Sequence, residues 1–451
     1  MEVIGILAAK RPGWSWTAQG DMPAVTTLLG DILRYLASIG SFQRDIKLFL
    51  IYSLFSNIGI GAFALLFNLY LVELGYREDV IGLFNGLSTV ALAVGALMLG
   101  RMLNRFGSWW CITYGTAAYV AASVLLAFMT DRLAILVVGA LQGIGTAFIF
   151  VPLMPFVIEH ARPETRSTVA ALSLSLTSVS ATIGSLVGGW APRLLGPLFG
   201  LAVPGVGSFR LGLLLSLILT ALALVPMLLM RQARYQQTQF TAQHLLVTSE
   251  ERREREARRH ALAFVLTGGL LSLGAGAVIP FYNVFLASIG LRASTIGVIY
   301  ALASLLGAVL GLFAPVLARR LGSLDAILVI RLMPVPFYLL LLLIPTVPIA
   351  IAAHIVRAIS ISMAWPIDST MVADILPPSA RANAFSLRSA AWNLGFALAS
   401  FLAGPVIVAA GYGPVFLAFV FFSVLSMVVF ALNFRGHPAA GRREQAVAKG
   451  S

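Results

Sequence analysis

Long apolar segments separated by short polar gaps follow one another from about residue 46 to residue 434. Each segment has about 20 apolar residues or more, which is the length at which a helix crosses the ~30 Å hydrocarbon core of a bilayer. A segment in lipid must satisfy its own backbone hydrogen bonds, and these segments are too long and too continuous for barrel strands, so we expect helices. The twelve predicted spans lie at about 46–74, 79–102, 109–129, 133–158, 167–192, 209–230, 261–288, 293–318, 324–344, 346–373, 382–410 and 413–434.

The second half of this pattern repeats the first. A polar stretch at 231–260 divides the spans six and six, and a shift of 215 residues aligns the halves without gaps over most of their length. The matched residues include Gly82 with Gly297, Asn68 with Asn283, and Arg105 with Arg320. Copies of six helices keep the same orientation in the membrane, which implies a pseudo-twofold axis along the membrane normal and a cavity between the halves.

Five parts follow from this organisation. They are a cytoplasmic tail at 1–45, a six-helix bundle at 46–230, a cytoplasmic linker at 231–260, a second six-helix bundle at 261–434 and a cytoplasmic tail at 435–451. Apolar positions from Val25 to Ile39 recur at helical intervals and predict an amphipathic helix on the inner membrane surface. Lys and Arg concentrate in the gaps on the side of the two termini, so we expect an inner (plasma) membrane protein with both termini in the cytoplasm.

Composition agrees with a membrane protein and excludes several classes. Charged residues make up 11% of the chain, against ~25% for a soluble domain, so we predict no soluble enzyme. The net charge of +13 comes from scattered gaps rather than from one polar face, which argues against nucleic acid as a partner. The single cysteine, Cys111, lies in an apolar span, and the sequence has neither paired metal-spaced histidines nor a phosphate-binding glycine loop. We therefore expect no metal and no cofactor.

The gap between the second and third spans reads Gly100-Arg101-Met102-Leu103-Asn104-Arg105-Phe106-Gly107. It resembles the loop signature G-x-L-A-D-R-x-G of the major facilitator superfamily, and the resemblance extends over residues 46–434 with the twelve-helix plan. This resemblance implies two pseudo-twofold related six-helix bundles and secondary transport by alternating access. Asn104 replaces the signature's acid, and Ser108-Trp109 replaces its basic pair, so the charged latch of many members must be weakened or replaced. Alternatively, the glycines serve only a tight turn and close packing.

A second, less specific resemblance lies in the fifth span. Gly184-Ser185-Leu186-Val187-Gly188-Gly189 is similar to the G-P-x-x-G-G end of a signature of drug and proton antiporters, with Ser185 in place of the proline. The signature's upstream glycines are absent, and small-residue packing explains Gly184, Gly188 and Gly189 nearly as well. The segment therefore favours export only slightly.

Four charged residues lie inside the predicted spans, where charge is costly and function is the default explanation: Arg331, Arg357, Asp368 and Arg388. The family resemblance implies that spans one, four, seven and ten line the cavity, and the tenth carries both Arg357 and Asp368. These two share one helix face about 16 Å apart. His354 lies one turn before Arg357 on the same side.

The depth of Arg331 and Arg388 matches that of Asp368. One hypothesis is that Asp368 is neutralised by one of these arginines in a structural ion pair. The other is that Asp368 carries a coupling proton when that pair opens. Arg357 has no partner evident from the sequence, so we expect it to attract a carboxylate or another anionic group, unless a polar group of another helix pairs with it.

Amides and aromatic residues complete the predicted pathway. Asn57 and Asn68 share a face of the first span, and Asn283 and Gln142 correspond to Asn68 and Arg357 under the repeat shift. These amides either bind solute hydroxyls and carbonyls or join helices. Tyr282 and Trp365 offer aromatic walls with a polar edge, with core packing as the alternative.

We predict a monomeric secondary transporter in the lipid bilayer that moves a small organic solute, coupled to protons and outward rather than inward. Three intramembrane arginines against one aspartate favour an alternative, an importer of a small anionic metabolite. A further alternative is a non-transporting membrane assembly or lipid-handling factor on the same scaffold.

Overall fold

The computed structural model describes residues 42–162, 165–230, 251–435 and 437. The helices all belong to one compact unit that begins at Arg44. Most of the predicted first tail, including its amphipathic helix, most of the linker and most of the second tail lie outside the described residues. Within the described residues, twelve helices are long enough and apolar enough to cross a membrane. This confirms the predicted all-helical membrane fold.

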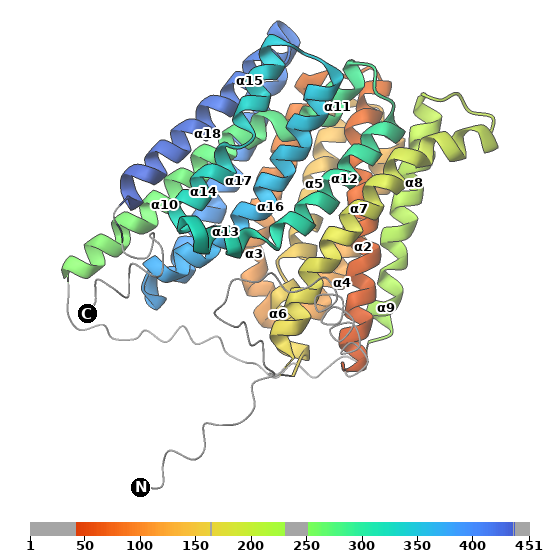
Figure 1. Ribbon diagram of the computed structural model, residues 1–451. Coiled ribbons are helices and arrows are strands. Elements are labelled where there is room, and N and C mark those ends of the chain that lie inside the picture. Colours follow the sequence, from red (N-terminus) through yellow and green to blue (C-terminus); the bar gives the residue numbers. More distant parts are fainter. Residues whose placement is uncertain (1–41, 163–164, 231–250, 436, 438–451) are drawn as a thin grey trace, which may run out of the picture. The chain divides into compact units, whose positions relative to one another are not determined.

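The first half, here the N half, contains the first six spans (Figure 1). Two of its spans are divided into two helices, the fourth near Pro152 and the sixth at Ala223. The helices are α2 (Arg44–Glu73), α3 (Glu78–Phe106), α4 (Ser108–Phe128), α5 (Arg132–Phe150), α6 (Leu153–His160), α7 (Arg166–Leu198), α8 (Val206–Leu222) and α9 (Leu224–Leu228).

The second half, the C half, contains the other six spans, and prolines lie at breaks in two of them. Pro280 lies in a short 3-10 turn inside the seventh span, and Pro334 separates two helices of the ninth, because proline has no N–H to continue the ladder. Helix α16 continues through Pro366. The elements are α10 (Glu251–Val278), η2 (Ile279–Phe281), α11 (Tyr282–Ser288), α12 (Ala293–Gly311), α13 (Ala314–Leu321), α14 (Ser323–Leu332), α15 (Val335–Leu343), α16 (Val347–Ile375), α17 (Pro378–Ala410) and α18 (Gly413–Phe434).

The two ends of the bundle are distinguished by the helix termini that lie there. The terminal end is where α2 begins at Arg44 and α18 ends at Phe434. The distal end is the opposite one, where α2 ends at Glu73 and α3 begins at Glu78.

The predicted sequence repeat is also a structural repeat. Gly75 and Gly290, which correspond under the shift, turn the chain at the distal end with φ of 88° and 92°. Gly107 and Gly322 do the same at the terminal end, with φ of 82° and 92°. Such positive φ values suit glycine because it has no Cβ. The repeated glycines are therefore explained by repeated turns.

Arginine side chains at the terminal end follow the same symmetry. Arg166 Nε donates to the carbonyl oxygen of Ala161 at 3.2 Å, and Arg381 Nε donates to that of Leu376 at 2.9 Å. Both carbonyls follow the last turn of a helix, where no intrahelical N–H is left for them. The two halves thus close the same loop with the same bond.

Candidate functional site

Close helix crossings join the halves at the distal end. Helices α3 and α17 meet where a Cβ on Gly82 would lie 3.3 Å from the Cα of Gly404. Helices α7 and α12 meet where a Cβ on Gly189 would lie 2.7 Å from the Cα of Gly297. The repeat shift converts one crossing into the other. Only glycine permits backbones to approach this closely, so the four glycines hold the distal end closed.

A reciprocal pair of hydrogen bonds crosses the same interface. Asn68 Nδ2 on α2 donates to the carbonyl oxygen of Pro280 at 2.6 Å, and Asn283 Nδ2 on α11 donates to that of Leu65 at 2.8 Å. The shift carries Asn68 onto Asn283 and Leu65 onto Pro280, so the two bonds are pseudo-twofold copies. Of the two possibilities left open by the sequence, these amides join helices in this conformation.

Two further polar contacts cross the distal interface. Tyr412 Oη donates to Glu78 Oε1 at 2.9 Å, and Arg77 Nη2 donates to the carbonyl oxygen of Val408 at 3.2 Å. Burial and the adjacent Glu78 carboxylate raise the pKa of Tyr412, which keeps its hydroxyl protonated. Tyr412 is therefore available as a donor throughout the physiological pH range.

A pocket of about 600 Å³ opens beside this closure at the distal end. Its wall comes from both halves and includes Glu73, Gly189 and Arg193 of the N half and Leu291 and Arg292 of the C half. The pocket adjoins the crossing at Gly189, so it lies on the distal side of the closed interface.

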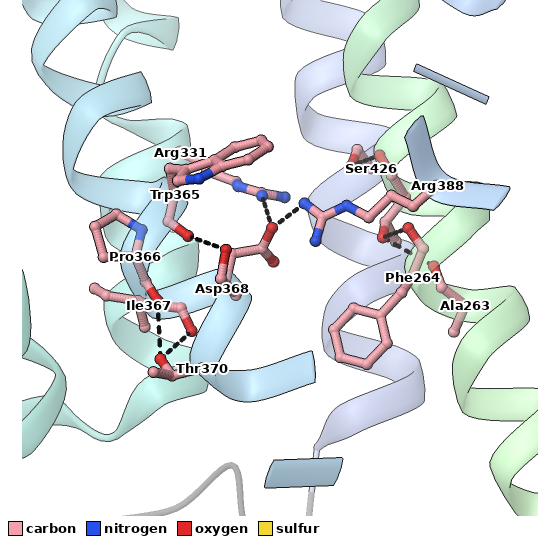
Figure 2. Close-up of polar contacts among 12 residues, drawn as sticks. Ala263, Phe264, Arg331, Trp365, Pro366, Ile367, Asp368, Thr370, Arg388 and Ser426 are labelled. Atoms are coloured by element: carbon pink, nitrogen blue, oxygen red, sulfur yellow. Dashed lines mark hydrogen bonds and ion pairs between the residues drawn. The ribbon is translucent and has the colours of Figure 1, made fainter. Parts of the chain in front are cut away.

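Asp368 forms the centre of a buried charged cluster in the C half. Its Oδ2 accepts a hydrogen bond from Arg331 Nη2 at 2.9 Å and a second one from Arg388 Nη2. Figure 2 shows the carboxylate between the two guanidinium groups. Arg331 lies in the last turn of α14, Asp368 in α16 and Arg388 in α17, so the cluster ties together the ninth, tenth and eleventh spans. The sequence hypothesis had only one arginine pairing with Asp368.

The cluster carries a net positive charge and unused hydrogen-bonding capacity. Asp368 is only 1% exposed, and its Oδ1 has no hydrogen-bond partner among the described residues. Arg331 Nε and Nη1 are likewise buried without partners in the described chain. The Arg331 guanidinium lies 5.9 Å from the ring centroid of Phe430 on α18. One carboxylate thus faces two cations, and one of its oxygens is free for a proton.

Arg357 lies on the same face of α16, closer to the distal end, in an aromatic enclosure. Its Nη2 donates to His354 Nδ1 at 3.1 Å, and its guanidinium lies 5.6 Å from the ring centroid of Tyr282. The Tyr300 and His354 rings are tilted against each other with centroids 4.0 Å apart, and Tyr338 lies beside Tyr282 with ring centroids 6.1 Å apart. Arg357 is 6% exposed and makes no ion pair within the described residues. The sequence had identified Tyr282 and His354, but not Tyr300 or Tyr338.

The matching place in the N half is neutral. Gln142 and Ser123 occupy the positions that correspond to Arg357 and Tyr338, and Gln142 Nε2 donates to Ser123 Oγ at 2.6 Å. Both residues are buried. In this conformation Gln142 therefore links α5 to α4.

The family model of the Major Facilitator Superfamily matches residues 48–359 and 335–450. The chain belongs to the Major Facilitator Superfamily. It is an integral multi-pass membrane protein, in agreement with the twelve apolar helices of its described residues.

Sequence relatives of this superfamily member match only in part. It is 27% identical over 118 residues to the "Multidrug resistance protein MdtH" of Aeromonas hydrophila, which is 26% of this chain and 30% of the relative. It is 24% identical over 180 residues to the "Uncharacterized MFS-type transporter MJ1560" of Methanocaldococcus jannaschii, which is 40% of this chain and 46% of the relative. The alignments thus span less than half of either relative.

Solved structures share the fold over most of the chain. A bacterial homologue of the human lysosomal transporter Spinster has a TM-score of 0.68 at 16% identity, with 87% of this chain and 96% of that chain covered. The nucleoside transporter NupG has a TM-score of 0.66 at 15% identity, covering 87% and 100%. A D-xylose-proton symporter has a TM-score of 0.66 at 12% identity, covering 85% and 97%. These likenesses show the fold.

Glu159, which was not among the residues predicted from the sequence, forms hydrogen bonds at the end of the signature loop. Glu159 on α6 accepts hydrogen bonds from the backbone N–H and the Oγ of Ser108, the first residue of α4. A carboxylate at this position complements the positive end of the α4 dipole. The presence of Ser108 where the family signature has a basic residue was the available signal.

The loop residues themselves have different surroundings. Asn104 and Arg105 are exposed, and the Arg105 guanidinium lies 5.2 Å from the ring centroid of Phe106. Gly107 makes the turn at positive φ, as the glycine alternative expects. Gly100 has no neighbour within 4 Å of the place of a Cβ, so close packing does not explain Gly100.

The fifth-span glycines and the remaining pathway candidates are also placed. A Cβ on Gly184 would lie 2.6 Å from the carbonyl oxygen of Ile58, and Gly188 also packs on α2, so both serve packing within the N half. Asn57 Nδ2 donates to the carbonyl oxygen of Ser53 on its own helix, at 2.7 Å. Trp365 is 68% exposed and is therefore not core packing.

Proposed function

We propose that this transporter exports a small organic solute in exchange for protons, and that Asp368 carries the proton. The observation that supports this most directly is the position of Asp368, which is the only fully buried carboxylate among the described residues. One of its oxygens has no partner, whereas the other accepts from two arginines. A proton on Asp368 removes the charge that holds both arginines, so protonation changes the contacts among three spans.

Helix α17 provides a route from this cluster to the distal closure. Arg388 and Gly404 lie on the same continuous helix, about 24 Å apart along its axis. A movement of α17 after release of Arg388 therefore acts on the crossing with α3 at Gly82. This coupling links protonation to opening, as alternating access requires.

The proposal includes the orientation of the chain in the membrane and the conformational state of the two halves. The positive-inside rule puts both termini in the cytoplasm, so the distal end faces outward. The glycine crossings and asparagine bonds join the halves at that end. On this basis the conformation is closed to the outside, with a protonation site nearer to the cytoplasmic side. We further propose that the monomer is the working unit.

Export is supported by the partial likeness to proteins named for multidrug resistance. Export can be tested in proteoliposomes that have an acidic lumen and contain a pH-sensitive dye. Small organic solutes from a panel are added one at a time to the outer solution. The expected result is solute uptake with alkalinisation of the lumen, because protons leave in exchange.

Variants at two aspartates make this test specific. Asp368→Asn should reduce proton-coupled uptake at least about tenfold, whereas Asp325→Asn, the same change at an exposed residue, should leave it near wild type. Equal proton-coupled rates in wild type and Asp368→Asn would refute the proton role. A chain that shows no counterflow with any solute and co-purifies with a membrane complex would support the non-transporting alternative instead.

A specific observation favours a second candidate, import of a small anionic metabolite. Away from the span ends, three arginines but only one aspartate lie inside the spans of the C half, and the corresponding N-half residues carry no compensating charge. In the same proteoliposomes an importer would carry an anionic solute inward down its concentration gradient together with protons, acidifying the lumen instead of alkalinising it. The sign of the luminal pH change therefore separates the two candidates.

A further inference from the structure

Arg357 is a buried cation without a counter-anion among the described residues. A guanidinium stays protonated in proteins, so burial cannot neutralise it as it can a lysine. Removing an ion from water costs several kcal/mol unless an opposite charge compensates for it. The energetics of this site therefore call for an anion.

The known neighbours of Arg357 do not supply one. His354 Nδ1 must accept from Arg357, because a guanidinium only donates, and the imidazole is consequently neutral with its proton on Nε2. The Tyr282 ring gives a cation–π contact, and its hydroxyl is already used as a donor to the carbonyl oxygen of Ala350 at 2.7 Å. These contacts shield the cation, but they add no negative charge.

Two buried donors in this enclosure remain unused. Arg357 Nε and Tyr338 Oη have no hydrogen-bond partner among the described residues. Tyr338 is fully buried on α15, next to the Tyr282 ring that Arg357 covers. Its hydroxyl oxygen lies close to two donors, the Arg357 guanidinium and the Tyr282 hydroxyl, so it is the Tyr338 proton that has no acceptor. Arg357 Nε and Tyr338 Oη can both donate to one acceptor. Unused buried donors are costly, which makes an acceptor between them favourable.

We propose that Arg357 and Tyr338 form a binding site for a small monovalent anionic group, with Tyr282 and His354 as its walls. The occupant is either a free halide or the carboxylate of an organic anion, because both offer a compact negative acceptor. The guanidinium supplies the positive charge, and the Arg357 Nε–H and the Tyr338 hydroxyl orient the anion by donating hydrogen bonds to it.

The N half shows what this place looks like without an anion. Gln142 and Ser123 satisfy each other directly with a neutral hydrogen bond, so no donor pair is left over there. A variant at Gln142 is therefore a matched control at the pseudo-twofold equivalent position. The anion site does not depend on the direction of transport or on Asp368. If its occupant is an organic anion, that anion would be the transported solute, and this part of the inference rests on the proposed function.

Anion binding is measured on the purified full-length chain in detergent, without a gradient. Sodium bromide or sodium acetate replaces sodium sulfate at constant ionic strength, and the melting temperature is followed by tryptophan fluorescence. A ligand that binds only the folded state raises this temperature with a saturable dependence. We expect such saturation in wild type and in Gln142→Ala. Tyr338→Phe, which removes one hydrogen bond and keeps the ring, should weaken the apparent affinity about five- to tenfold.

Arg357→Gln should abolish the saturable response, and Tyr338→Phe keeps the test decisive if Arg357→Gln does not fold. If the melting temperature responds saturably to bromide but not to acetate, the occupant is a free halide. If it responds saturably to acetate and bromide competes with acetate, the occupant is a carboxylate. The site is disproved if wild type shows no saturable response to either anion, or if Tyr338→Phe responds as wild type does. Asp368→Asn should keep the anion response, so loss of proton coupling and loss of this site are distinguishable.

Discussion

The N half and the C half share one backbone plan but differ in their buried charge. Distal glycines, the crossed asparagines and the loop arginines occur in both copies with the same contacts. The four charged residues that lie inside the spans of the C half, away from the span ends, have neutral counterparts under the repeat shift. Arg331 corresponds to Thr116, Arg357 to Gln142, Asp368 to Leu153 and Arg388 to Ser173.

This difference separates the requirements of the scaffold from those of the chemistry. Closing one end of a two-half bundle needs matching surfaces on both halves, so the closure residues are repeated. A protonation site or an anion site needs only one copy, and each additional buried charge costs several kcal/mol. The asymmetry therefore identifies the C half as the part that carries the proposed coupling and binding, and the N half as its structural partner.

The largest expected effect comes from making the C half resemble the N half at one charged position only. Asp368→Leu introduces the residue type found at Leu153 and leaves Arg331 and Arg388 buried without a carboxylate. Removing one partner of a buried ion pair costs about 3–5 kcal/mol, so the melting temperature should fall sharply. The measurement is thermal unfolding followed by tryptophan fluorescence.

Neutralising the whole cluster should reverse most of that loss. The triple variant Arg331→Met, Asp368→Leu, Arg388→Met keeps similar side-chain volumes and leaves no uncompensated charge, as in the N half. It should be more stable than Asp368→Leu alone, although it lacks the proposed proton site. A triple variant no more stable than the single one would show that the cluster is not held by charge compensation.

The next effect tests whether the two distal crossings are equivalent. A Cβ on Gly82 would press on Gly404, and a Cβ on Gly297 would press on Gly189. Overpacking costs about 1–3 kcal/mol, which corresponds to a shift of about 5- to 150-fold away from the closed distal end. Gly82→Ala and Gly297→Ala should therefore open the distal end to a similar extent, and Gly100→Ala, where no neighbour is near, should not.

Spin labels on the distal ends of the two halves provide the measurement. In a Cys111→Ser background, cysteines at the exposed residues Phe199 and Arg292 place one label on each half. Double electron–electron resonance should show a longer distance population in both alanine variants. An effect confined to one crossing would show that the pseudo-twofold closure is not energetically symmetric.

Much of the scaffold was predictable because it depends on properties that a sequence displays directly. Twelve spans follow from apolar length, and the repeat follows from matched positions such as Asn68 with Asn283. The family signature also led to the correct superfamily. Gly107 was expected in a tight turn, and it has the positive φ that this turn requires.

Side-chain partners across the bundle were less predictable, because span periodicity fixes a face but not the neighbouring helix. Tyr338 lies in another span than Arg357, and no pattern links the two. The bonds from Ser108 to Glu159 depend on how α6 meets α4. Asp368 was matched by depth with both arginines, but only the structure shows that both reach the same oxygen.

The smallest effect concerns an asymmetry hidden inside the crossed asparagine bonds. In a continuous helix the carbonyl of Pro280 would accept from the N–H of Val284, but that N–H donates to Asn283 Oδ1 instead. The carbonyl of Leu65 lies within the continuous helix α2, where the intrahelical ladder serves it. Pro280 therefore depends on Asn68 more than Leu65 depends on Asn283.

Asn68→Ala should consequently disfavour the closed distal end by about 1–2 kcal/mol, because it leaves a buried carbonyl without a donor. Asn283→Ala should cost about 0.5–1 kcal/mol, since it removes one bond and frees the N–H of Val284 for Pro280. The same pair of labels measures both variants, and Asn57→Ala, whose amide bonds only within its own helix, is the control. If Asn283→Ala opened the distal end more than Asn68→Ala, this ranking of the two bonds would be wrong. The carbonyl that depends more on its asparagine would then be that of Leu65 on α2, and not that of Pro280 at the break in the seventh span.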